Sequence, residues 1–367
     1  MASKTDERAE EHYLDAIEAQ ENDDREGALS SARQVVKLNP EHAEAWWLIS
    51  TLELPLNKQP NLIQASRSLA ACRKVIEIEH EHGPAWVRGG QILGDELGMY
   101  EEALSWWQQR REIDALEAVP IIEQSAILAD IGMYRKASTH LNMVVEHDLE
   151  ISPKQFTKVA RLSGLLQKAA DEEPSSYFRP WESRHPGWEG IRRRKNKGPM
   201  SESLIFLLFV TPFLVIEVWL SRGLAGAGFM AFCFTSMVLL ATVGLGIKFT
   251  RNIFHKVNRP AFDLLRAQDI ETSSGHSVIP EDIRTSKLYM SILQRRPLAY
   301  QERTLAIVEG GNSLPKGWKP TIPDLEVEYD EDAAVISCLI EAIMSKRSIQ
   351  IHWPDLKDTE QWVQGWK

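Results

Sequence analysis

The sequence has few of the residues and motifs that usually carry out chemistry. Its three cysteines, Cys72, Cys233 and Cys338, stand far apart and form no pair with metal-ligand or redox spacing. It contains no His-Glu-x-x-His, Cys-x-x-Cys or Gly-x-Ser-x-Gly motif and no dinucleotide-binding fingerprint. These absences argue against a disulfide framework, a metal site, a bound cofactor and the common hydrolases. We therefore expect a protein that is not an enzyme.

A basic excess is also missing from the N-terminal part. Residues 1–173 carry 31 acidic side chains and 18 basic ones. Nucleic acid is therefore not expected as a partner, because binding to phosphates requires the opposite charge. The first residues, MASKTDERAEEHY, lack the apolar core of a signal peptide. We expect the first domain to stay in the cytosol.

What the sequence does have is two long apolar runs, at residues 203–220 and 227–249. The hydrocarbon core of a bilayer is about 30 Å thick, so a helix needs about 20 apolar residues to cross it. Only a short segment, SRGLAG, separates the two runs. The sequence predicts a two-helix transmembrane hairpin at residues 201–250. The alternative is a pair of helices buried in a large soluble core.

Basic residues stand at both ends of this hairpin, whereas its tip carries only Arg222. Lys and Arg close to a span stay on the cytoplasmic side of the membrane. We therefore predict a membrane protein with two spans, whose N- and C-terminal domains are both cytoplasmic. The residues that indicate this topology are Arg192, Arg193, Arg194, Lys195, Lys248 and Arg251. Residues 173–200, rich in proline and arginine, are interpreted as a basic linker, with Trp181 and Trp188 near the lipid headgroups.

An internal repeat is visible before the hairpin. The sequence Gly-Met-Tyr-Glu-Glu-Ala at 98–103 recurs as Gly-Met-Tyr-Arg-Lys-Ala at 132–137, 34 residues later. Upstream, Trp46 and Trp86 each stand where a further repeat would begin. The period and these positions resemble the tetratricopeptide repeat (TPR) family, which implies antiparallel helix pairs stacked in a solenoid. Four repeats are expected over about 5–150, with a capping helix from Ser152-Pro153 closing a solenoid of residues 5–172.

The resemblance implies a groove that holds a peptide or a helix of another protein. The acidic first repeat favours a basic ligand. Trp46 and Trp86 match packing positions of the family, whereas Trp47 and Trp106 are turned about 100° from a packed neighbour on an α-helix. We therefore predict that they lie in the groove or on the surface. The predicted partner-binding residues are Trp47, Trp106, Glu11, Asp15 and Glu18.

The part after the hairpin, residues 251–367, is interpreted as a small cytoplasmic α/β domain. The helix that leaves the membrane is expected to end before Pro260, and another helix is expected at about 280–295. Alternating residues predict strands at 325–329 and 348–353, with a helix at 330–345 between them. Gly310-Gly311 is expected to form a turn. The whole chain is thus predicted to be mainly α: a TPR-like solenoid, a transmembrane hairpin and a mixed α/β domain.

Three functional hypotheses follow. The first is a membrane-anchored adaptor or scaffold that binds a protein partner in its TPR groove on the cytoplasmic side. The second is an accessory subunit of a transport or translocation complex, or a homo-oligomer, assembled through the small residues Gly228, Gly244 and Gly246 of the hairpin. The third is that the C-terminal domain is an enzyme that acts on what the TPR domain delivers. The sequence does not identify the partner.

Overall fold

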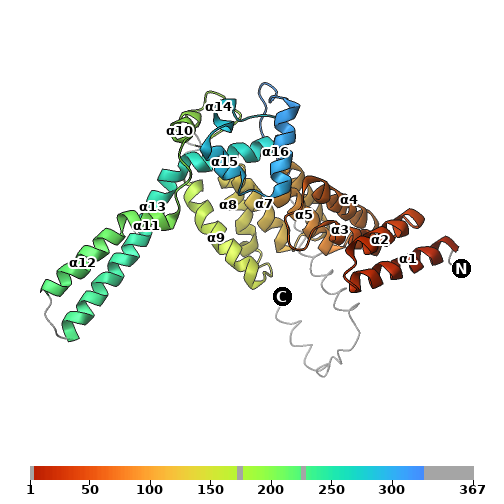
Figure 1. Ribbon diagram of the computed structural model, residues 1–367, viewed down its shortest axis with the longest axis horizontal. Helices are drawn as coiled ribbons and strands as arrows, with labels where there is room; N and C mark the ends of the chain where they lie inside the picture. Colours follow the sequence, from red (N-terminus) through yellow and green to blue (C-terminus); the bar gives the residue numbers. More distant parts are fainter. Residues whose placement is uncertain (1–3, 172–176, 225–228, 326–367) are drawn as a thin grey trace, which may run out of the picture. The chain divides into compact units, whose positions relative to one another are not determined.

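The computed structural model describes residues 4–171, 177–224 and 229–325, which form helices and no sheet (Figure 1). One isolated bridge joins Ser277 and Ser313. The prediction of a mainly α protein is confirmed for these residues. The described part of the predicted α/β domain, 251–325, is helical, so it gives no support to a mixed domain. The predicted strand at 325–329 lies almost wholly outside the described residues, as do the helix at 330–345 and the strand at 348–353.

The first part of the chain is a series of helix pairs (Figure 1). Each pair packs together and also packs against the next pair along the chain. The pairs are α1 (Lys4–Glu21) with α2 (Arg25–Leu38), α3 (Ala43–Glu53) with α4 (Leu62–Ile78), α5 (Gly83–Gln91) with α6 (Tyr100–Ile113), and α7 (Ala118–Asp130) with α8 (Tyr134–Glu146). A π-helical turn, η1 (Ile92–Glu96), extends α5, and α9 (Pro153–Ala170) covers α7 and α8. The helix predicted from Ser152-Pro153 is confirmed, because Ser152 caps α9.

The helices α3 and α5 begin with the same local structure. His42 and His82 are their N-caps, and each ring accepts a hydrogen bond from the backbone N–H three residues later. The indole Nε1 of Trp46 donates to the carbonyl of Pro40 at 2.8 Å, and that of Trp86 donates to the carbonyl of His80 at 2.8 Å. These two helices are therefore structurally equivalent, although their tryptophans stand 40 residues apart in the sequence.

The repeated Gly-Met-Tyr segments form matching turns between paired helices. Gly98 and Gly132 have φ values of +63° and +87°, a left-handed conformation that strongly favours glycine. Met99 N–H donates to the carbonyl of Leu93 at 2.8 Å, and Met133 N–H donates to that of Leu128 at 2.8 Å. The 34-residue repeat in the sequence thus corresponds to a left-handed glycine before the second helix of a pair, while the first of the two turns contains one more residue, at the π-helical η1.

Glycines allow α5 to approach α6 closely. A Cβ atom added at Gly89 would lie 2.2 Å from the ring of Trp106, and one added at Gly90 would lie 2.1 Å from that of Trp107. Trp106 is only 6% exposed, and its Nε1 donates to the carbonyl of Trp86 at 2.8 Å. The prediction that Trp106 lies in a groove or on the surface is wrong, because its indole fills the space that Gly89 leaves.

Three helices form the apolar hairpin: α11 (Glu202–Phe209), α12 (Thr211–Leu224) and α13 (Phe229–Ser274). Both α11 and α12 run beside α13 (Figure 1). The predicted first span is interrupted between Phe209 and Thr211, just before Pro212, whose ring cannot donate a helical hydrogen bond. The second predicted span forms the first half of α13.

The helix α13 does not end before Pro260, as the sequence predicted, but continues to Ser274. Contacts from the preceding segment hold it just before Pro260, where the proline breaks the hydrogen bonding of the helix. The amide of Asn258 exchanges two hydrogen bonds of 2.9 Å with the backbone of Met200. Arg194 Nη1 donates to the carbonyl of Val257 at 2.7 Å. The residue before a proline disfavours a helix, but these tertiary contacts outweigh that tendency.

The segment interpreted as a linker is partly folded. It contains α10 (Gly187–Arg194), and the buried rings of Phe178 and Trp188 pack edge to face at 5.0 Å between centroids. They belong to a second core with Leu264 of α13. The predicted placement of Trp188 at the headgroups is therefore wrong. Trp181 packs edge to face against Trp318, at 6.2 Å between centroids.

The helix predicted at 280–295 is divided into α14 (Glu281–Arg284) and α15 (Lys287–Leu293), because Ser286 caps the second one. The carboxylate of Glu271, at the end of α13, accepts hydrogen bonds from both terminal nitrogens of Arg284. It also accepts from the backbone N–H groups of Val278 and Ile279. This buried ion pair fixes the loop after α13. The last described helix is α16 (Leu298–Gly310), which ends at Gly311 with φ +66°, so the predicted turn there is confirmed.

The far end of α13 is joined to the helix pairs through the carboxylate of Asp269, which is 4% exposed. The hydroxyl of Tyr100 in α6 donates to it at 3.1 Å, and that of Tyr300 in α16 donates at 3.0 Å. Arg296 supplies the opposite charge. Burial raises the pKa of Asp269, and the Arg296 guanidinium opposes that shift. One carboxylate therefore connects three segments that are distant in sequence.

A second buried polar group lies between α7 and α8. His140 is 7% exposed, and its Nε2 lies 2.8 Å from Oε1 of Gln124. Burial, together with the nearby charge of Arg111, lowers the pKa of His140 to about 4. The folded protein therefore holds this histidine neutral at pH values where an unfolded chain would protonate it.

Replacement of Asp269 tests the connection to α13. In an Asp269→Asn variant Arg296 keeps its charge without a buried counter-ion, so we expect about 2 to 4 kcal/mol lower stability. The measurement is the denaturation midpoint of the full chain in detergent, followed by tryptophan fluorescence. Asp282→Asn is the matched control, because it removes an exposed pair with Arg192 and should cost less than about 1 kcal/mol. Equal shifts in the two variants would contradict the assignment.

The histidine predicts a dependence of stability on pH. Its folded pKa lies below the ordinary value of 6.5, so the unfolded chain binds more protons as the pH falls from 6.5 towards 4. Over this window the wild-type chain should lose about 2 to 3 kcal/mol more than a His140→Gln variant, which cannot titrate there. Denaturation midpoints at pH 7.5, 6 and 4.5 check this, and parallel curves for the two chains would exclude His140 as the cause.

Candidate functional site

Two groups of side-chain contacts lie along the first helices of the pairs. The guanidinium of Arg88 in α5 lies over the ring of Trp47 in α3, at 4.0 Å from its centroid. Further along, Lys158 of α9 donates to Glu123 of α7 at 2.6 Å. We call this the first-helix surface. It comprises Trp47, Arg88, Asp95, Glu96, Glu123 and Lys158.

At one end of the first-helix surface, Trp47 is half-buried and held in place. Arg88 covers one face of its ring through a cation–π contact and also bonds the hydroxyls of Ser50 at 3.1 Å and Thr51 at 2.5 Å. The ring of His82 lies 5.1 Å away. Trp47 is thus oriented by its neighbours while part of it remains accessible. Its role in partner binding stays a prediction.

The middle of the first-helix surface is acidic. Loss of contact with water raises the pKa of the Asp95 carboxyl, and the negative charge of Glu123 adds to this shift. Burial also raises the pKa of Glu96, with a contribution from Asp95. Oε2 of Glu96 is buried and has no hydrogen-bond partner within the described residues. Lys158, which pairs with Glu123, opposes these shifts at Asp95. Asp95 and Glu96 repel each other, so a further positive charge beside them would be favoured.

The sequence did not single out Asp95, Glu96 or Glu123. They come from η1 and α7, and nothing in the chain order shows that these elements place their carboxylates together. The only available signal was that Asp95 follows Arg88 by seven residues, a spacing that returns to about the same helical face.

The structure separates the predicted acidic residues from Trp47. The side chains of three predicted residues are exposed on α1: Glu11, Asp15 and Glu18. At 100° per residue, they lie on the side of the helix roughly opposite the buried Ala9 and Ala16. Ala9 packs in one cluster with Ala45 of α3. The three carboxylates therefore face away from α3, which carries Trp47. Their role in binding also stays a prediction.

Within the described ranges, no group of three or more His, Cys, Asp or Glu residues could hold a metal ion. Cys72 is buried, and burial raises the pKa of its thiol to about 11. Because the thiolate is the reactive form, Cys72 is held unreactive at neutral pH. Cys233 is exposed on the hairpin.

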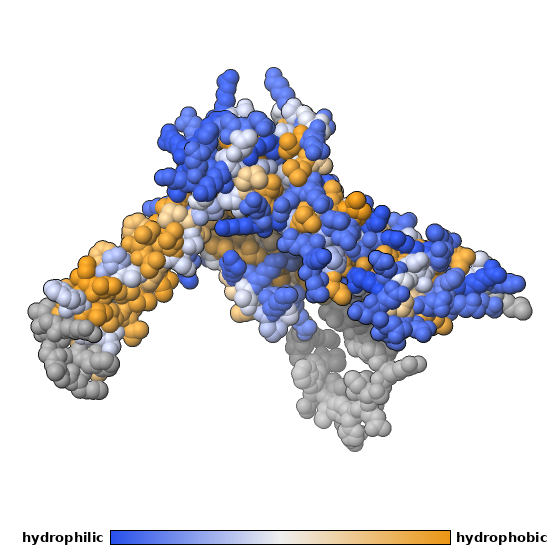
Figure 2. Space-filling model, viewed as in Figure 1, coloured by the Kyte–Doolittle hydropathy of each residue, from blue (hydrophilic) through white to orange (hydrophobic). Residues whose placement is uncertain are grey.

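The hairpin exposes a large apolar surface. Figure 2 shows hydrophobic residues gathered over α11, α12 and the first half of α13. Leu207, Phe213 and Leu240 are 58%, 67% and 74% exposed. Two of the described helical stretches, Glu202–Leu220 and Cys233–Ser274, are long and apolar enough to cross a membrane, and only 11% of each apolar window is buried. Burial in a soluble core, the alternative interpretation, does not fit this exposure.

The predicted topology residues lie at the base of the hairpin, and several also support the fold. Arg192 pairs with Asp282 at 3.0 Å, Arg193 with Glu189 at 3.2 Å, and Arg251 with Glu202 at 3.4 Å. Arg194 bonds α13, as described above, and the carbonyl of Lys195 accepts from Leu288 N–H at 2.9 Å. Lys248 is exposed on α13. Their positive charge is therefore concentrated beside one end of the apolar surface.

Comparison with known proteins gives one match. Residues 324–367 match a family described as "Tryptophan-rich protein (DUF2389)". Almost all of this stretch lies outside the described residues, and it is a small part of the chain. No curated protein matches the chain, and no TPR family model matches its helix pairs.

Proposed function

We propose that the protein is a membrane-anchored adaptor whose TPR-like solenoid binds a basic segment of a protein partner on the cytoplasmic side. The observation that supports the proposal is the first-helix surface, because it includes an oriented aromatic ring on α3 and, further along the helix pairs, the neighbouring carboxylates Asp95 and Glu96. A basic peptide would gain from both, through cation–π contact with Trp47 and ion pairs with Asp95 and Glu123.

The hairpin supports the membrane part of this proposal. The Lys and Arg residues at its base favour placing that end in the cytoplasm, together with the helix pairs that precede it. An anchor confines the first-helix surface to a thin layer beside the bilayer. The effective concentration towards a partner in the same membrane is then high, so that weak contacts suffice.

A second candidate function is that of a subunit assembled through its hairpin. The surroundings of Gly244 and Gly246 on α13 differ, and the difference favours assembly through the hairpin. A Cβ at Gly246 would lie 2.5 Å from Val210, so this glycine serves packing within the hairpin, whereas nothing lies within 4 Å of Gly244. Gly244 therefore leaves an open notch that a neighbouring membrane helix could fill. Gly228 lies outside the described residues.

The binding proposal predicts an effect of charge that depends on position. A fluorescent 12-residue Lys/Arg peptide should bind the full chain in nanodiscs about tenfold or more weakly when Asp95, Glu96 and Glu123 are changed to their amides, because three favourable charge contacts disappear. The measurement is fluorescence anisotropy at 150 mM salt. The matched control is the triple amide variant of Glu11, Asp15 and Glu18, which loses the same net charge but should bind normally.

Two outcomes would contradict this site. If both triple variants lose affinity equally, the peptide responds to net charge and not to the first-helix surface. If neither variant loses affinity, the carboxylates of η1 and α7 do not bind the peptide.

The proposed topology predicts a labelling pattern. In a background in which Cys72, Cys233 and Cys338 are changed to serine, a cysteine at Arg222 should react with a membrane-impermeant maleimide added to intact cells. Cysteines at Gly164 and Lys316 should react only after the membrane is opened, because the basic flanks keep both domains in the cytoplasm. Labelling of Gly164→Cys in intact cells would reverse the orientation, and labelling of only one of the two domain positions would exclude a two-span hairpin.

A further inference from the structure

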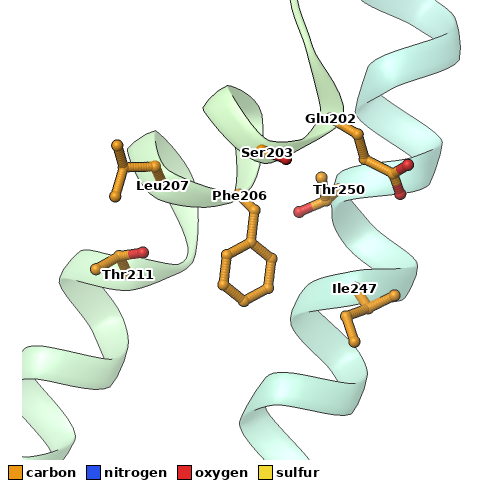
Figure 3. A pocket seen from close by; sticks show the side chains of 7 residues that line it. All are labelled: Glu202, Ser203, Phe206, Leu207, Thr211, Ile247 and Thr250. Carbon is orange, nitrogen blue, oxygen red and sulfur yellow. The ribbon is translucent and has the colours of Figure 1, made fainter.

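The interruption of the first apolar helix creates a pocket at the base of the hairpin. α11 ends at Phe209 and α12 begins at Thr211, and a cavity of about 330 Å³ lies between this break and α13 (Figure 3). Its lining is amphipathic. The residues are Glu202, Ser203, Phe206, Leu207, Thr211, Ile247 and Thr250.

One polar group in this pocket lacks a partner. Thr250 is 1% exposed, and its hydroxyl has no hydrogen-bond partner within the described part of the chain. Threonine in a helix commonly bonds the carbonyl four residues earlier, but here the hydroxyl points across the pocket towards α11 (Figure 3). A buried hydroxyl without a hydrogen bond destabilises the folded protein. A ligand that supplies a hydrogen-bonding oxygen would remove that cost.

The charges at the mouth of the pocket are of both signs and adjacent. Glu202 lines the pocket, and its carboxylate lies 3.4 Å from Nε of Arg251. Both side chains are at least half exposed, so each can exchange this contact for a ligand. Lys248 is also exposed one turn away on α13. The mouth therefore suits a headgroup that carries an anion and a cation together, with the cation on Glu202 and the anion on Arg251.

The deeper lining is largely apolar, with Thr211 as its polar member. Phe206, Leu207 and Ile247 line the cavity, and Figure 3 shows the ring of Phe206 between α11 and α13, with Ile247 on α13. This order, from charged mouth through a hydroxyl to apolar side chains, is the order of groups in a phospholipid that enters from the cytoplasmic leaflet.

We propose that this pocket binds one zwitterionic aminophospholipid, with its ammonium group on Glu202, its phosphate on Arg251, an ester or phosphate oxygen on the hydroxyl of Thr250, and one acyl chain along Phe206 and Ile247. The inference rests on the proposed insertion of the hairpin in a bilayer. It does not depend on peptide binding at the first-helix surface.

The test is native mass spectrometry of the full chain released from nanodiscs of phosphatidylcholine with 10% phosphatidylethanolamine. We expect one retained phosphatidylethanolamine per wild-type chain. Thr250→Val, which keeps the shape and removes the hydroxyl, should lower its occupancy about five- to tenfold. Glu202→Gln should lower it about tenfold or more, because the ammonium loses its counter-ion. The matched control is Thr242→Val, two turns deeper on α13, which should retain the lipid.

Three results would overturn the proposal: no retained lipid on the wild-type chain, equal loss in Thr250→Val and Thr242→Val, or equal retention of phosphatidylglycerol, which has no ammonium group. Displacement by soluble phosphoethanolamine at millimolar concentration would also overturn it, because the acyl chain would then contribute nothing. Failure of the wild-type chain to enter nanodiscs would instead contradict the membrane hairpin itself.

Discussion

The structure depends on one helix, α13, that belongs to the apolar hairpin at its first residues and to the helical core at its last. Near Pro260 this helix is held by hydrogen bonds, between Asn258 and the backbone of Met200 and between Arg194 and the carbonyl of Val257. At its end Asp269 accepts hydrogen bonds from Tyr100 and Tyr300 and pairs with Arg296. A buried carboxylate with three donors fixes direction as well as distance. The hairpin and the helix pairs are therefore connected through one continuous helix and its buried carboxylate.

The connection between α13 and the helix pairs also affects how an anchored binding surface would be oriented. The two Gly-Met-Tyr turns both meet α13 or its neighbours: Gly98 approaches Tyr300, and Gly132 approaches Arg266, which bonds Tyr134. A flexible linker would raise the local concentration of a binding surface but leave its orientation free. A surface fixed through two consecutive turns has a defined orientation towards its anchor. A partner that is itself held in the membrane would then bind only if its own segment points the right way, which adds selectivity without added contacts.

The sequence predicted those parts that depend on local or periodic signals. The repeat that contains Gly98 and Gly132, the cap at Ser152 and the two apolar runs were all visible in the chain order. It failed where packing between distant segments decided the outcome. Trp106 was assigned to the surface by its angle from a neighbour, but a helix between two others buries more than one face. Pro260 and the prolines of 173–200 indicated breaks that contacts with α13 overcome. The carboxylates of Asp95 and Glu123 are close only because η1 and α7 are adjacent.

The acidic surface and the basic base of the hairpin also fit together physically. Lys and Arg near a bilayer attract anionic lipids, and each contributes about 1 kcal/mol close to the membrane surface. In the proposed function, a basic partner segment would be drawn towards the same lipids, so the membrane would compete with the protein for it. Desolvated carboxylates such as Asp95 and Glu96 offer a stronger and more specific counter-charge than a screened headgroup layer. The raised pKa values of Asp95 and Glu96 come mainly from burial, an environment that the proposed binding of a basic segment would use.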